Sequence, residues 1–481
     1  MSTDTEKARR SDLHQAERLR LLSSTERDLI RLANEPGFHR WLEQIKSIGG
    51  CAHPIYLAGH TTTRDAITGE VLRHYDTSEE PGGRMPLRCR NRRETRCEPC
   101  ARLHSGDTFH LVRSGLLGGK GVSDRVQLHP RLFVTLTAPS FGAVHRASGP
   151  ERAVCRPRRD GGSCEHGRPI GCGQTHADTD PAVGQPLCPD CYDYVGHTLW
   201  HASAGSLWNR FCHTLRRHLA TAAGITQTRL REHLTLSFAK VAEYQKRGAV
   251  HFHAVVRLDG PDGPSSPPPL WATPATLAGA VRSAATAVEV RAPYSPATGE
   301  RVIRWGEQLD VHPIRSEAFG GSTAVTDNAV AAYVAKYVSK SVGDSGGLDY
   351  RIAAYKSIEL APVNSHFRTL MAFCWRLGGL PELDSLNLRA WTHTLGFRGH
   401  VLTKSRQYST TYAELRAVRD EYRNSDDVAI STDTTVTESA WRYVGSGYSI
   451  AEGEIAAGIA EDLATLGEVR KEIRESREDG Y

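Results

Sequence analysis

Residues 234–258 read LTLSFAKVAEYQKRGAVHFHAVVRL, and this stretch decides the fold. Two runs rich in β-branched and aromatic residues, at 234–244 and 250–258, flank the polar connection Lys246-Arg247-Gly248. The pattern predicts a β-hairpin, because such runs favour strands and a glycine in a short polar connection allows a tight reversal. An antiparallel sheet is therefore expected around this hairpin.

The second strand of this hairpin carries two histidines, His251 and His253. Alternate residues of a strand point to one face, so these imidazoles project side by side while Phe252 faces the core. Two neutral imidazoles on one strand form a clamp for a divalent metal. The first strand offers Glu243 or Gln245 as the third ligand. Glu243 is favoured, because a carboxylate suits Mg²⁺ or Mn²⁺.

A helix is predicted over residues 326–341, and it repeats the pattern Tyr-x-x-Lys. Tyr333 and Tyr337 are one turn apart on one face, and Lys336 and Lys340 repeat this offset on a neighbouring face. A phenol, with a pKa of about 10, is a poor nucleophile unless the phosphate is polarised and a cation stabilises the phenolate. Taken alone, the helix pattern favours the interpretation that the tyrosines are packing residues and the lysines are solvated. Beside a two-histidine metal site, it favours nucleophilic chemistry.

Composition sets the class of protein. The chain has 481 residues, enough for two or three domains that each bury a core. Its hydrophobic share of 39% and charged share of 24% are ordinary for a soluble protein. No apolar run approaches the ~20 residues of a membrane span, and the charged N-terminus lacks the apolar segment of a secretion signal. A cytoplasmic location is expected, where the eleven cysteines stay reduced and clustered ones indicate metal ligands.

Basic residues are concentrated at 84–102 and 152–168, although the net charge is only +5. Such clusters suit the phosphate backbone of a nucleic acid, and a solvated basic face is the alternative interpretation. Residues 115–121, GLLGGKG, match a phosphate-binding loop only in part. Ser114 stands where the first glycine belongs, and Gly121 stands where Ser or Thr should follow the lysine. We therefore expect a turn here and no nucleotide cofactor.

The first group of cysteines is Cys51, Cys89, Cys97 and Cys100. Four thiols are enough for a closed tetrahedral zinc site, and the Cys97-x₂-Cys100 half is its strongest signal. Cys51 lies far upstream in the sequence, so His104 competes with it for the fourth position.

A second group of possible zinc ligands follows at 155–191. Cys188-Pro-Asp-Cys191 is typical of a zinc knuckle, and Cys172-x₃-His176 is a candidate to complete it. We also count Cys164 among the ligands, whereas Cys155 and His166 belong to another site or are alternative ligands. The two groups together predict one to three structural Zn²⁺ ions. Outside them, the isolated Cys212 and Cys374 are expected to be small core residues.

These segments predict an α+β protein. It has an antiparallel core sheet with flanking helices, small zinc-stapled Cys/His-rich modules and a mostly helical C-terminal region. The expected modules are a helical N-terminal extension (1–48), a Cys/Arg-rich zinc-stapled module (49–128), a domain with the histidine hairpin and the Tyr-Lys helix (129–345) and a zinc insertion at about 150–192, a helical, basic region (346–425) and an acidic helical tail (426–481).

Three motifs follow one another along the chain: Phe133-Val-Thr-Leu-Thr137, then His-Phe-His, then Tyr-x-x-Lys. This order resembles the HUH family of single-strand endonucleases. The resemblance implies that residues 129–345 form a nicking domain and that residues 346–425 form a DNA-contacting region. In that family, the first motif is a core strand, the second binds the metal and the third supplies the nucleophile. The doubled tyrosine resembles the two-tyrosine branch of single-stranded-DNA phage initiators. One-tyrosine relatives keep a nucleophile that matches Tyr337 and a following lysine that matches Lys340, so Tyr337 ranks before Tyr333.

Residues 135–142, 240–248 and 396–406 resemble actinobacterial replication initiators of Streptomyces-type plasmids and integrating conjugative elements. The likeness extends from about residue 51 to 416. It implies a protein that nicks one strand of an origin, keeps a 5′-phosphotyrosine link and leaves a 3′-OH that primes rolling-circle replication, before it rejoins the ends. Single-stranded origin DNA, a host helicase and a DNA polymerase are the expected partners. Candidate DNA contacts are Arg398, Lys404 and Arg406, with a buried turn as the alternative.

Two other functions fit parts of the sequence. A non-catalytic, zinc-stapled DNA-binding plasmid regulator would need the cysteine groups and basic clusters, but not a Tyr-Lys helix beside a histidine hairpin. A hydrolytic nuclease would use His251 and His253 with an activated water, and would leave no protein on the DNA.

Overall fold

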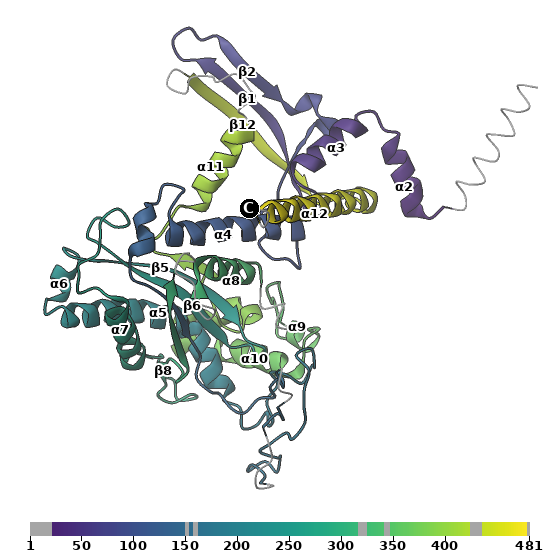
Figure 1. Cartoon of the computed structure of the whole chain (residues 1–481). Helices are drawn as coiled ribbons and strands as arrows, with labels where there is room; N and C mark the ends of the chain where they lie inside the picture. The colour runs from purple at the N-terminus through teal and green to yellow at the C-terminus, as the bar shows by residue number, and fades with distance from the viewer. Residues whose placement is uncertain are drawn as a thin grey trace, which may run out of the picture. The chain divides into compact units, whose positions relative to one another are not determined.

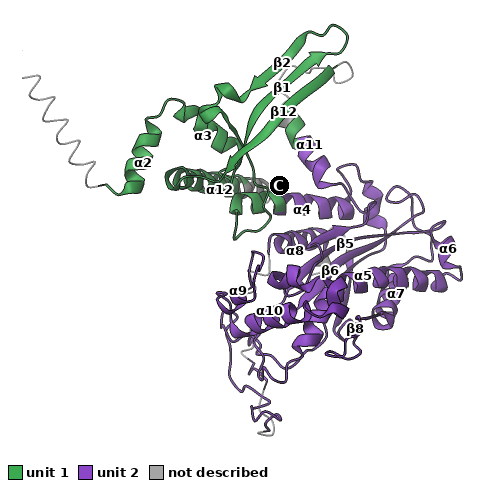
Figure 2. Ribbon diagram, turned by 180° about the vertical axis from the view of Figure 1, so that it is seen from behind, with its two compact units in different colours: residues 1–104, 419–481 green, residues 105–418 purple. Residues whose placement is uncertain are grey.

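The computed structural model describes residues 22–149, 153–156, 162–315, 325–340, 347–423 and 435–478. The chain divides into two compact units, one formed by residues 1–104 with 419–481 and the other by residues 105–418 (Figure 2). The first unit thus joins two segments from opposite ends of the sequence. The five consecutive modules expected from the sequence stay predictions.

The larger unit is built on a sheet in which six described strands lie in the order β10-β9-β4-β6-β5-β11. The strands are β4 (Arg131–Leu136), β5 (Thr235–Tyr244), β6 (Val250–Asp259), β9 (Leu309–Arg315), β10 (Val325–Thr326) and β11 (Leu402–Lys404). All neighbours are antiparallel except β9 and β10, which are parallel. The predicted hairpin is confirmed, because β5 and β6 pair from Thr235↔Asp259 to Tyr244↔Val250.

Helices cover this sheet, and a small hairpin of β7 (Glu289–Arg291) and β8 (Val302–Arg304) lies beside it. The helices are α5 (Tyr194–Ala222), α6 (Gln227–Leu230), α7 (Pro274–Ala287), α8 (Asp327–Ser339), α9 (Lys356–Glu359) and α10 (Ser365–Leu377), with 3₁₀ turns at Asp124–Leu128, Pro381–Leu386 and Leu388–Thr394. Helices α4 (Glu98–Leu117) and α11 (Tyr412–Arg423) contain residues of both units.

The two faces of the sheet pack against different helices (Figure 1). Phe252, Ala254 and Val256 of β6 are buried in a core shared with α5, α7 and α10. Val255, which points the other way, lies in a second core with Val330 and other residues of α8. This alternation confirms that Phe252 faces the core, and it directs His251 and His253 to the face of the sheet that α8 covers.

The smaller unit has a second sheet around β1 (Ile55–Asp65). Strand β1 pairs with β2 (Val71–Asp76), β3 (Met85–Leu87) and β12 (Thr435–Ser446). Its helices are α2 (Ser24–Ala33), α3 (Phe38–Ser47) and α12 (Ile450–Glu478), with 3₁₀ turns at Thr77–Glu79 and Pro81–Gly83. Trp41 and Ile45 of α3 pack with Ala456 of α12 and with Cys51 and Cys97.

Two local features differ in detail from the prediction. The described part of the helical N-terminal extension expected at residues 1–48 contains two helices, where α2 ends at Ala33 and α3 begins at Phe38, because Pro36-Gly37 interrupts the helical pattern. The expected helical tail contains strand β12, which pairs with β1 along its whole length, from Ile55↔Ser446 to Asp65↔Thr435. The β-branched and aromatic residues of β12 suit this strand. Among the described helices, none is long and apolar enough to cross a membrane.

Candidate functional site

The hairpin brings one carboxylate and two imidazoles together. Glu243 lies directly opposite His251 in the register, and His253 is one place further along the same face. Glu243 Oε2 lies 3.0 Å from His251 Nε2 and 2.9 Å from His253 Nε2, and the two Nε2 atoms are 3.1 Å apart. These three residues, which we call the hairpin cluster, could hold a metal ion.

Neighbouring side chains orient the two imidazoles. Thr135 of β4 pairs with His253 in the register, and its Oγ1 lies 3.0 Å from His253 Nδ1. The ring of Phe133 stacks on His253, with ring centroids 5.7 Å apart and planes 5° apart. On the other side, Gln245 Nε2 lies 3.4 Å from His251 Nδ1. Contacts at Nδ1 leave both Nε2 atoms directed at the hairpin cluster. The contact of Thr135 with His253 was not predicted from the sequence, because it depends on the pairing of β4 with β6.

Electrostatics favour the protonation states that a cation requires. Burial opposes the charge of Glu243, but hydrogen bonds with His251 and His253 outweigh it and lower the pKa of Glu243 to about 2. Burial also lowers the pKa of His253, against the opposing hydrogen bond to Glu243, so this imidazole tends to stay neutral. A charged carboxylate and a neutral imidazole are the forms that bind metal.

Helix α8 places two tyrosines against the hairpin cluster. The helix begins after Thr326, whose side chain accepts a hydrogen bond from the Ala329 amide. The Tyr333 hydroxyl donates to Glu243 Oε2 at 3.2 Å and lies 3.0 Å from His253 Nε2. The Tyr337 ring lies 4.6 Å from the Tyr333 ring, between centroids. Both tyrosines predicted from the sequence therefore lie next to the predicted ligands.

The two predicted lysines lie beside Tyr337. Lys340 Nζ is 5.0 Å from the centroid of the Tyr337 ring, and Lys336 Nζ is 5.8 Å from it. Burial and the charge of Glu243 raise the pKa of Tyr333 and of Tyr337. Both phenols are therefore protonated near neutral pH, and a nearby cation would favour the phenolate.

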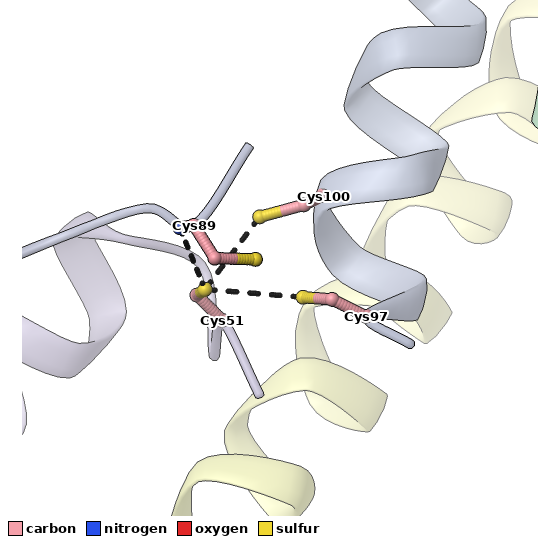
Figure 3. Close-up of side chains that lie close together, drawn as sticks. All are labelled: Cys51, Cys89, Cys97 and Cys100. Carbon is pink, nitrogen blue, oxygen red and sulfur yellow. Dashed lines mark hydrogen bonds between the residues drawn. The ribbon is translucent and has the colours of Figure 1, made fainter. Parts of the chain in front are cut away.

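The first cysteine group forms a compact cluster (Figure 3). Cys51, Cys89, Cys97 and Cys100 bring their sulfur atoms together, with Cys51 Sγ 3.8 Å from Cys97 Sγ and 3.6 Å from Cys100 Sγ. Zinc–sulfur bonds of about 2.3 Å in a tetrahedron set adjacent sulfurs about 3.8 Å apart, far beyond a disulfide bond. The amides of Ala52 and Cys89 donate to Cys97 Sγ and Cys51 Sγ. Among the described residues, His104 does not belong to this cluster.

The second cysteine group splits into two clusters, which corrects our expected ligand set. Cys172 and His176 do not complete the Cys188–Cys191 knuckle. The first cluster consists of His145, Cys155, Cys172 and His176, and the second of Cys164, His166, Cys188 and Cys191. The spacing of Cys172-x₃-His176 does not show which distant residues fold against it, and His145 was missed for this reason.

The three predicted DNA contacts differ in their surroundings. Arg398 is exposed, and its Nη1 donates to the backbone carbonyl of Ser385 at 3.1 Å. Lys404 Nζ donates to the Ser409 carbonyl at 2.8 Å and holds the turn after β11. Arg406 is exposed. A role of these residues at DNA stays a prediction.

Comparison with known proteins gives the family. The family model described as "RepSA: Replication initiator protein, pSAM2" matches residues 37–461. A replication initiator protein of Streptomyces ambofaciens is 44% identical over 455 residues, which cover 92% of this chain and 95% of that protein. No solved structure matches the chain. The chain therefore belongs to the RepSA family of replication initiator proteins.

Proposed function

We propose that this replication initiator nicks one strand of a plasmid or integrative-element origin by a metal-dependent attack of a tyrosine. The observation that carries the proposal is the contact between the hairpin cluster and the tyrosines of α8. Tyr333 lies within hydrogen-bond distance of Glu243 and His253, and the Tyr337 ring lies 4.6 Å from the Tyr333 ring, between centroids. A plasmid regulator without enzymatic activity has no need for this arrangement.

The geometry of the hairpin cluster fits a divalent cation. The three donor atoms of Glu243, His251 and His253 are 2.9–3.1 Å apart. Octahedral bonds of about 2.1 Å, as Mg²⁺ prefers, set neighbouring donor atoms about 3.0 Å apart. These residues would therefore hold Mg²⁺ or Mn²⁺ by one face of its coordination shell. When bound, the cation would polarise the scissile phosphate and reduce its negative charge.

The reaction is a transesterification. The Tyr337 oxygen attacks the phosphorus, the bond from phosphorus to the 3′ oxygen breaks, and a 5′-phosphotyrosine link forms. The phenol loses its proton and the departing 3′ oxygen gains one, so no net proton is released. The new 3′-OH primes DNA synthesis. Because the phosphotyrosine bond conserves the energy of the broken bond, the ends can be rejoined without a nucleotide cofactor.

Tyr337 is our first choice as nucleophile, and Tyr333 the second. Lys340 and Lys336 lie over the Tyr337 ring and would stabilise its phenolate, whereas the Tyr333 hydroxyl donates a hydrogen bond to Glu243. Tyr333 could attack the regenerated origin after one round of replication. Transfer between two phenols would then end that round.

The expected partners follow from this chemistry. The nicked strand must be unpaired to reach the hairpin cluster, so we propose single-stranded origin DNA as the substrate. Exposed Arg398 and Arg406 are candidate contacts for its backbone. A host helicase and a host DNA polymerase would unwind and extend the nicked duplex.

The test incubates the protein with end-labelled single-stranded origin DNA and Mn²⁺, followed by a denaturing gel. We expect a covalent protein–DNA adduct that is lost in the double variant Tyr333→Phe plus Tyr337→Phe. Tyr294→Phe is the matched control, because Tyr294 is 61% exposed and is neither a member of the hairpin cluster nor part of α8. Cleavage without an adduct would favour a hydrolytic nuclease, and binding without cleavage would favour a regulator.

A further inference from the structure

The segment between β4 and α5 carries eight possible metal ligands whose order is informative. They occur as four pairs, and the first and third pairs share one cluster while the second and fourth pairs share the other. The pairs are His145 with Cys155, Cys164 with His166, Cys172 with His176, and Cys188 with Cys191. The two clusters thus interleave along the chain, instead of following one another.

The cluster of the first and third pairs is built for metal. His176 Nε2 lies 3.3 Å from Cys172 Sγ and 3.2 Å from His145 Nδ1. The other nitrogen of His176, Nδ1, lies 2.7 Å from Asp180 Oδ2. A carboxylate at Nδ1 fixes the tautomer that directs the Nε2 lone pair into the cluster, as it does for many metal-bound histidines. The Arg146 amide donates to Cys155 Sγ at 3.2 Å.

The cluster of the second and fourth pairs has three thiols and one imidazole. His166 Nδ1 lies 3.2 Å from Cys191 Sγ. The chain turns sharply at the first pair of this cluster, where the Gly167 amide donates to the Cys164 carbonyl at 2.8 Å and Gly167 has a φ of +70°. Such a turn brings both Cys164 and His166 to one point. Cys188 and Cys191, which have two residues between them, complete this cluster.

We propose that this segment, residues 143–192, is a two-zinc module in which the ligand pairs alternate between the two ions. The donor sets are Cys₂His₂ and Cys₃His, the thiolate and imidazole sets that zinc prefers. Each ion binds two ligand pairs, and a ligand pair of the other ion lies between these two pairs in the sequence. Loss of one ion should therefore loosen the ligands of the other, so that the two sites fold together.

The module also contacts the turn of the histidine hairpin. A Cβ atom at Gly184 would lie 2.3 Å from the Lys246 carbonyl oxygen, so only glycine permits this approach. Arg247 donates to the Pro139 carbonyl at 3.0 Å and, through Nε, to Gln245 Oε1 at 2.9 Å. Gln245 in turn lies beside His251 Nδ1. A consequence that rests on the proposed function is that zinc loss in the module slows nicking.

The test is ¹¹³Cd NMR of the full chain after exchange of its metals for ¹¹³Cd²⁺, since the cadmium shift reports the number of sulfur ligands. We expect three sulfur-ligated signals, of S₄, S₃N and S₂N₂ type, of which the S₄ signal belongs to the Cys51 cluster. Cadmium at the hairpin cluster has no sulfur ligand and appears elsewhere in the spectrum. Absence of either the S₃N or the S₂N₂ signal in the wild-type chain overturns the two-zinc module, whether or not the protein nicks DNA.

Two reciprocal variants test the alternation. If the pairs alternate, Cys172→His alters only the S₂N₂ site and retains the S₃N signal, whereas Cys164→His converts S₃N to S₂N₂ and removes it. If the sites follow one another along the chain, the outcomes are reversed: Cys172→His removes the S₃N signal and Cys164→His retains it. Histidine stays a possible ligand in both variants, which favours folding. Cys212→Ala is the control, because Cys212 is buried outside both clusters and should leave all three signals unchanged.

Discussion

The hydrogen bond behind His253 allows a sharp test of the proposed metal site. Thr135 is buried, and its hydroxyl lies 3.0 Å from His253 Nδ1. When His253 binds a cation through Nε2, its Nδ1 carries a proton that needs an acceptor, and Thr135 Oγ1 is in position to accept it. Thr135→Val keeps the shape of the side chain and removes only that acceptor.

The expected loss can be estimated. Removal of the partner behind a metal-bound histidine costs roughly 10- to 100-fold in metal affinity. Each factor of ten is about 1.4 kcal/mol, so Thr135→Val should weaken Mn²⁺ binding by roughly 1.4–2.8 kcal/mol. The nicking rate at saturating Mn²⁺ should change much less, because the variant keeps all three ligands.

The Mn²⁺ affinity is measured by calorimetric titration. The rate of nicking is measured in parallel as a function of the Mn²⁺ concentration. Thr137→Val is a matched control: Thr137 directly follows β4, is also buried, and donates to the Gln308 carbonyl at 2.7 Å instead of facing a histidine. An unchanged Mn²⁺ affinity in Thr135→Val would refute the reasoning. An equal loss in Thr137→Val would also refute it, since the effect would then come from the strand and not from His253.

Three further predictions concern other contacts. Lys340→Met should slow adduct formation on the order of 100-fold in single-turnover assays, and Lys336→Met less, because Lys340 Nζ is the closer of the two to the Tyr337 ring; equal effects would contradict this ranking. Cys51→Ser should remove one zinc ion per chain and lower the Tm, since structural zinc contributes directly to folding; unchanged zinc content would show that Cys51 is not a ligand. Arg131→Met removes the ion-pair partner of the buried Asp327 carboxylate at the start of α8. Urea titrations should show a free energy of unfolding that is lower by about 3–5 kcal/mol, and a loss below ~1 kcal/mol would contradict a stabilising role of this ion pair.

The features predicted correctly from the sequence depend on neighbouring residues. The hairpin is visible because its two strands are joined by a short turn, and strand alternation then puts Glu243, His251 and His253 on one face. Helical periodicity likewise puts Tyr333 and Tyr337 on one face of α8. That this helix packs on the hairpin came from the order of the motifs and their resemblance to a family, and not from local pattern.

The features that were missed depend on residues far apart in the sequence. Thr135 reaches His253 only because β4 pairs with β6. Among the described strands, β12 pairs with β1, more than 350 residues earlier, and the sequence does not show this distant partner. Spacing gave the cysteine pairs but not their assembly into clusters, and a lone His145 has no distinguishing signal before the chain folds. Non-local pairing of this kind is decided by the tertiary structure.

The central claim concerns the atom that attacks the DNA. The most direct measurement is mass spectrometry of the peptide that remains attached to the origin strand after nicking with Mn²⁺ and proteolysis. We expect nucleotides linked through a 5′-phosphate to Tyr337, with Tyr333 modified when Tyr337 is replaced by phenylalanine. A strand with a free 5′-phosphate and no attached peptide, or a link to a residue outside α8, would contradict the proposed mechanism.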